Sequence, residues 1–114
     1  MDKMEAAKLF KQILAHSTLD HDIYVLVMSS FCNLLIYEYL LTRNEEAINE
    51  AMEIAEKLLK IAEKQESHRL LVIAHIINAK IMRVLKDYEN AKHILNNARE
   101  IAKEHNLIFF TKND

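Results

Sequence analysis

Residues 85–102 read "LKDYENAKHILNNAREIA", in which an acidic turn stands between two helical patterns and Ala91 and Ala98 follow it seven residues apart. Residues with that spacing lie two turns apart on the same face of a helix. Small side chains on one face let a second helix come close, because larger side chains hold the backbones apart. This stretch therefore predicts a pair of closely packed helices joined by a short turn.

The helical pattern continues outward from this stretch over most of the chain. Apolar residues that recur every three or four positions predict five helices, over 3–16, 20–41, 44–65, 68–86 and 88–104. The connections between these ranges are at most three residues long, so consecutive helices are expected to be antiparallel neighbours. The chain has neither glycine nor proline, which disfavours the tight turns of β-hairpins.

The second predicted helix is the most apolar of the five. A transmembrane helix needs about 20 apolar residues, and Asn33 and Glu38 interrupt this run. Two strands would need turn residues between them, and none are present. The segment therefore favours a helix that is buried on several sides. Between Ile23 and Leu41 its polar residues are Ser29, Ser30, Asn33 and Glu38.

Composition bounds the class of protein and its partners. A chain of 114 residues with 51% hydrophobic and 28% charged residues is typical of one soluble globular domain, spanning 1–114. Without glycine there is no phosphate-binding loop, dinucleotide fingerprint or nucleophile elbow. The net charge is −2 and nothing in the sequence resembles the basic stripe that nucleic-acid binding needs, so we expect no nucleic-acid partner. A single cysteine and an amphipathic start without a signal peptide lead us to expect a cytoplasmic protein without a membrane span.

Two stretches of the chain resemble each other. "LTRNEEA" at 41–47 matches "LKDYENA" at 85–91, and "AMEIAEKLLKIAEK" at 51–64 matches "AKHILNNAREIAKE" at 91–104. The two offsets are 44 and 40 residues, which indicates a helical hairpin that occurs twice. The difference of four residues indicates that the third predicted helix of the chain is about one turn longer than the fifth.

The second hairpin resembles the tetratricopeptide repeat. That family places a small residue in the first helix, an alanine twelve positions later, then a large apolar residue and another alanine. The residues at those spacings are Ala79, Ala91, Leu95 and Ala98. The family's turn is matched by Leu85, Asp87, Tyr88 and Ala91, with Lys86 in place of its glycine. The departures are the absent proline and a unit of 40–44 residues instead of 34.

The resemblance implies an all-α fold, an antiparallel helical-hairpin stack that forms a right-handed α-solenoid of about five helices. Segment 3–16 would be a half repeat, 24–65 and 68–104 the two repeats, and 107–114 an apolar tail. An alanine-rich helical hairpin outside this family would share the same spacings and remains the alternative.

The resemblance also implies a function, because the family generally binds proteins or peptides in a concave groove lined by the first helix of each repeat. We therefore expect a protein-interaction module or scaffold within a regulatory or signalling assembly. The alternatives are a domain that senses a ligand or signal peptide, and a purely structural homo-oligomer. The residues expected to line the groove are Ser29, Cys32, Ile36 and Tyr39 from the second helix, and Ile73, Ile76, Lys80 and Arg83 from the fourth.

No catalytic or metal-binding pattern stands out. The six histidines show no paired ligand spacing, and Cys32 lies among apolar residues without a basic partner. We expect no enzyme activity, cofactor or metal. The apolar tail and the few polar residues of the second helix lead us to expect self-association, with a homodimer as the first expectation. The tail residues concerned are Leu107, Ile108, Phe109 and Phe110.

Overall fold

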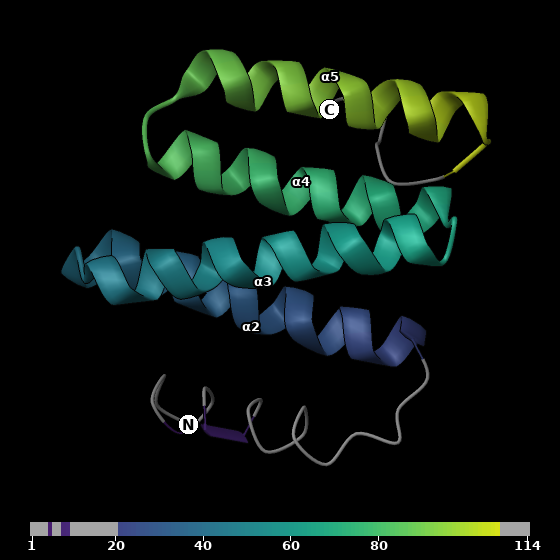
Figure 1. Ribbon diagram of the computed structural model, residues 1–114. Coiled ribbons are helices and arrows are strands. Elements are labelled where there is room, and N and C mark those ends of the chain that lie inside the picture. The colour runs from purple at the N-terminus through teal and green to yellow at the C-terminus, as the bar shows by residue number, and fades with distance from the viewer. Residues whose placement is uncertain (1–4, 6–7, 10–20, 108–114) are drawn as a thin grey trace. The chain divides into compact units, whose positions relative to one another are not determined.

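The structure is a computed structural model that describes residues 5, 8–9 and 21–107 (Figure 1). Its elements are the helices α2 (His21–Thr42), α3 (Glu45–Lys64), α4 (His68–Val84) and α5 (Tyr88–Glu104). The part of the chain that is described contains no strand, so the prediction of an all-α protein is confirmed. The helix predicted over 3–16 lies almost wholly outside the described residues. Within that range Glu5, Lys8 and Leu9 are described, and each is helical.

The chain forms two compact units, one made of residues 1–54 and the other of residues 55–114. In the first unit, α2 packs on the beginning of α3. The thiol of Cys32 is fully buried and donates a hydrogen bond to the carbonyl oxygen of Ala51 at 3.4 Å. Ala51 is itself fully buried, and its small side chain allows this close approach of a side chain to the α3 backbone.

The turn between α2 and α3 is held by side-chain hydrogen bonds. The hydroxyl of Thr42 donates to the carbonyl oxygen of Glu38 at 2.9 Å and accepts from the backbone N–H of Asn44 at 3.2 Å. The side-chain oxygen of Asn44 accepts a hydrogen bond from the backbone N–H of Glu46 at 3.1 Å, and this bond caps the start of α3. Two connecting residues are therefore enough to reverse the chain.

In the second unit, α4 and α5 lie side by side and run antiparallel (Figure 1). Each begins at a side-chain cap, since Ser67 accepts a hydrogen bond from the N–H of Leu70 and Asp87 accepts one from the N–H of Asn90. Ala98 has no exposed surface, so its expected place on the packing face of α5 is confirmed. The core around it consists of Val72, Ala98 and Ala102, with Ile76, Ile101 and Leu107 packed against them.

Three helices end in the same way, with a residue in the left-handed backbone conformation. The φ angles of Glu66, Lys86 and Asn106 are 50°, 66° and 55°. The next residue in each case donates its N–H to a carbonyl five residues back, and the left-handed residue donates to a carbonyl three residues back. These paired bonds are those of the Schellman motif, which satisfies the last carbonyl groups of a helix.

The Schellman ending also explains why α4 is shorter than the sequence predicts. We expected this helix to continue to residue 86, but it ends at Val84, Leu85 is its C-cap, and Lys86 adopts the positive φ. Glycine is the usual residue at that position because it has no Cβ to clash with the backbone. Since the chain has no glycine, the sequence does not mark the ends of α3 and α4 in the customary way, and only Asn106 after α5 is of a residue type that often adopts this conformation.

Candidate functional site

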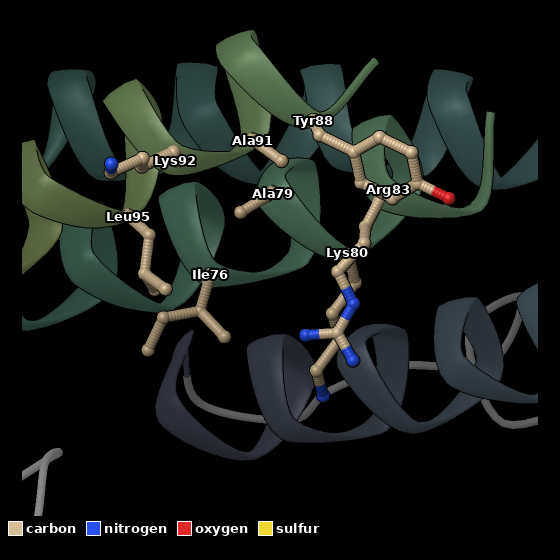
Figure 2. Close-up of a pocket in the computed structure, with 8 residues that line it drawn as sticks. All are labelled: Ile76, Ala79, Lys80, Arg83, Tyr88, Ala91, Lys92 and Leu95. Carbon is tan, nitrogen blue, oxygen red and sulfur yellow. The ribbon is translucent and has the colours of Figure 1, made fainter. Parts of the chain in front are cut away.

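The second unit contains a pocket of about 320 Å³ between α4 and α5, which we call the α4–α5 pocket (Figure 2). A volume of this size suits a small ligand or one or two side chains of a peptide. The pocket is lined by Ile76, Ala79, Lys80 and Arg83 from α4, and by Tyr88, Ala91, Lys92 and Leu95 from α5.

Small and aliphatic side chains form the apolar part of the pocket. Ala79 and Ala91 are buried at the point where the two helices approach, and Figure 2 shows them next to each other. Ile76 and Leu95 are half-buried, and their side chains extend on the same side of the helix pair (Figure 2). The apolar surface therefore exists because two alanines bring the helices together and leave the larger side chains at the edge.

Cationic side chains surround this apolar surface. Lys80 and Arg83 extend from α4 in the same direction, and Lys92 extends from α5 at the other end of the pocket (Figure 2). All three are exposed, and Tyr88 adds an exposed ring with a phenol group. Among the described residues that line the pocket none is acidic, so this described lining carries three formal positive charges although the whole chain has a net charge of −2.

Three of the residues expected in a groove therefore lie together in this pocket, namely Ile76, Lys80 and Arg83. Ile73 is half-buried and does not belong to the lining. The members from α5 were missed because the groove was expected to be lined by the first helix of each repeat. The available signal was that Tyr88, Ala91 and Leu95 lie three and four residues apart and so share one face of α5.

The four groove residues expected from the second helix lie in the first unit. Cys32 and Ile36 are core residues, because they belong to the face of α2 that packs inward, and their side chains are not open to a partner. Ser29 and Tyr39 are half-buried, and the Arg43 guanidinium lies 5.5 Å from the centre of the Tyr39 ring. A single groove shared by α2 and α4 stays a prediction.

The histidines form no metal centre in the part of the chain that the structure describes. No group of three or more histidine, cysteine, aspartate or glutamate residues is placed to hold a metal ion among the described residues. His68 and His105 stack their rings, with the ring centres 3.5 Å apart. Burial lowers the pKa of His75 below its usual value of 6.5, and the negative charge of Glu63 partly opposes this effect.

One described helix, over Ile23–Thr42, is long and apolar enough to cross a membrane by length and composition. A third of its most apolar window is buried within the protein. Core helices of soluble proteins pass the same criterion, so this feature by itself is weak evidence for a membrane span.

Comparison with known proteins gives no relative from which to transfer a function. No family model, curated protein or solved structure matches the chain.

Proposed function

We propose that this protein is an interaction module that binds an acidic, partly apolar segment of a partner protein at the α4–α5 pocket. The observation that supports the proposal is the combination of an apolar surface with three lysine or arginine side chains, in a lining whose described residues include no acidic one.

The two parts of the pocket would contribute in different ways. An aliphatic or aromatic side chain of the partner would cover Ile76 and Leu95, and full burial of such a side chain is worth about 1.5–3 kcal/mol. Carboxylates on either side of it would meet Lys80, Arg83 and Lys92. Charge complementarity of this kind contributes mainly to specificity and to the association rate, and it weakens as salt increases.

The sequence repeat supports a wider architecture for this binding function. The alanine contacts of α4 and α5 and the self-similar stretches suit a tetratricopeptide-like solenoid, in which hairpins stack and present one extended surface. On this proposal the chain is a cytoplasmic scaffold within a regulatory assembly. Neither an enzymatic role nor a cofactor is needed for it.

Selection from a library of random 12-residue peptides displayed on phage tests the proposal. The expected peptides combine Asp or Glu with Leu, Ile or Phe, and their affinity is then measured by fluorescence anisotropy. Lys80→Glu together with Arg83→Glu should lower the affinity at least tenfold, because the peptide carboxylates would lose two attractions and meet like charges.

The matched control changes net charge equally at exposed lysines that do not line the pocket. Lys57→Glu with Lys103→Glu should leave the affinity within twofold of the unmodified chain. Selected peptides without acidic residues, or an equal loss of affinity in the control, would contradict the proposal.

A second candidate function is the sensing of a small amphipathic anion. The pocket volume of about 320 Å³ favours it, because this is near the lower end of the range for small-molecule sites. Isothermal titration with octanoate tests this candidate. Octanoate binding that Lys80→Glu with Arg83→Glu abolishes, in a chain for which no peptide is selected, would indicate a ligand sensor instead of a peptide-binding module.

A further inference from the structure

Helix α2 carries a row of exposed residues along the side that faces away from its core contacts. Leu26 is 66% exposed and Tyr37 54%, which is unusual for large apolar side chains on one helix. The row, which we call the α2 seam, consists of Ile23, Leu26, Ser30, Asn33, Tyr37 and Leu40, and every member is exposed. The opposite side of the helix is buried, with Val25, Met28, Cys32 and Leu35 among its core residues.

The spacing of the seam is that of a helix–helix interface. Successive members are three, four, three, four and three residues apart, an average of about 3.5 residues, which is the repeat of a coiled-coil seam. No member carries a charge, although 28% of the residues of the whole chain are charged. A face exposed to water in the working protein would be expected to carry charged residues, as the outer face of α3 does.

The order of apolar and polar residues along the seam is the same when it is read from either end. Two apolar residues come first, then two small polar residues, then two apolar residues. If a second copy of α2 packed antiparallel about a two-fold axis near Phe31, Ile23 would face Leu40 of that copy and Leu26 would face Tyr37. Ser30 would face Asn33 across the axis. A two-fold interface requires such self-complementarity, because the same patch serves both subunits.

We propose that this protein forms a homodimer in which the α2 seams of two copies of the chain pack against each other in antiparallel orientation. The apolar pairs at both ends of the seam provide the apolar surface that the dimer buries. The Ser30–Asn33 pairs at the centre fix the register, since a shift would place these polar groups against apolar side chains. This inference concerns α2 alone and does not depend on the α4–α5 pocket.

The size of the seam sets the expected affinity. From Ile23 to Leu40 it is about 26 Å long, at 1.5 Å per residue, and a helix is about 10 Å wide. One helix face of these dimensions buries less than the roughly 800 Å² per partner of a standard interface. We therefore expect a dimer that dissociates in the micromolar range.

Sedimentation equilibrium of the full chain between 1 and 200 µM measures this association. Leu26→Glu should raise the dissociation constant at least tenfold, because it buries one uncompensated charge at each of two symmetric positions. Met52 on α3 is also an exposed apolar residue, so Met52→Glu is the matched control and should leave the constant within twofold. A monomer over the whole range, or equal loss in both variants, overturns the proposal.

Disulfide trapping tests the antiparallel arrangement. Leu26→Cys with Tyr37→Cys on one chain should give a covalent dimer under mild oxidation, whereas Leu26→Cys alone should not. In the antiparallel pair the two copies of position 26 are about 16 Å apart along the axis, beyond the reach of a disulfide. The unmodified chain, whose Cys32 is buried, is the control. Efficient trapping by Leu26→Cys alone would overturn the antiparallel arrangement.

Two other occupants of the seam give different results in the same experiments. If the tail 107–114 mediates the dimer, its deletion will abolish association while Leu26→Glu will not. If the seam lies on a membrane, the chain will be a monomer in solution and will sediment with phosphatidylcholine vesicles, and Leu26→Glu will remove that binding. Either outcome overturns the proposed dimer. Far-ultraviolet circular dichroism of every variant verifies that the helical fold is retained.

Discussion

Replacing Lys86 by glycine should stabilise the protein, although it removes a side chain. Lys86 follows the C-cap of α4 with a φ angle of 66°, and its N–H donates to the carbonyl oxygen of Arg83 at 3.0 Å. A residue with a Cβ in the left-handed region is disfavoured by roughly 1–2 kcal/mol relative to the right-handed region. Glycine removes this cost because it has no Cβ.

The gain is reduced by the effect of glycine on the unfolded chain. Glycine makes the unfolded state more flexible, which costs roughly 0.4–1 kcal/mol. The difference predicts that Lys86→Gly raises the free energy of unfolding by about 0.5–1 kcal/mol. For a chain of this size the midpoint of thermal unfolding should rise by roughly 2–6 °C.

Urea titration followed by circular dichroism measures the change, and two variants separate the backbone effect from loss of the charge. Lys86→Ala removes the ammonium group but keeps the Cβ, so its urea midpoint should stay within experimental error of the unmodified chain. Asn106→Gly should stabilise less than Lys86→Gly, because asparagine tolerates the left-handed region better than lysine. A decrease in stability of Lys86→Gly, or an equal increase in Lys86→Ala, would refute the reasoning.

Two further predictions concern the packing and titration of the second unit. Ala98→Leu should lower the free energy of unfolding by about 1–3 kcal/mol, because Ala98 has no exposed surface and a larger side chain would force α4 and α5 apart; an unchanged urea midpoint would show that α5 can shift at no cost. Burial lowers the pKa of His75 in the folded state below its value of 6.5 in the unfolded state, so the unfolded chain takes up a proton first as the pH falls. The contribution of His75 to stability is therefore complete above pH 6.5 and decreases below it, and His75→Gln should reduce the loss of stability between pH 7 and pH 5. Equal pH dependence of the two proteins, measured as urea midpoints, would contradict this assignment.

The predicted pocket residues show how far helical periodicity reaches. Ile76, Lys80 and Arg83 were expected on one surface because residues three or four apart on a helix are neighbours. Lys92 and Leu95 were not, because their place beside α4 depends on how the two helices are rotated about their axes. The contact between Ala79 and Ala91 sets that rotation, and the sequence indicates which residues are small but not which side of each alanine remains open.

The α2 seam illustrates the same limit in the most apolar helix. Ile23, Leu26 and Tyr37 are exposed, whereas Val25, Met28 and Cys32 are buried, and both groups are apolar or nearly so. Hydrophobic periodicity assigns a buried face only when polar residues mark the opposite face. In α2 too few polar residues are present to make that distinction, so tertiary packing alone separates the two faces.

The sequence by itself determined the helices and their connections. Periodic apolar residues define α3 and α5, and Ser67, Asp87 and Asn44 lie where their side chains cap the helix starts. These are local properties, since a cap or an amphipathic stripe involves residues within one or two turns. The tertiary structure decided which apolar face of α2 and α4 is buried and how the α4–α5 pocket is shaped. These features depend on contacts between residues distant in the chain, which no local pattern of residues specifies.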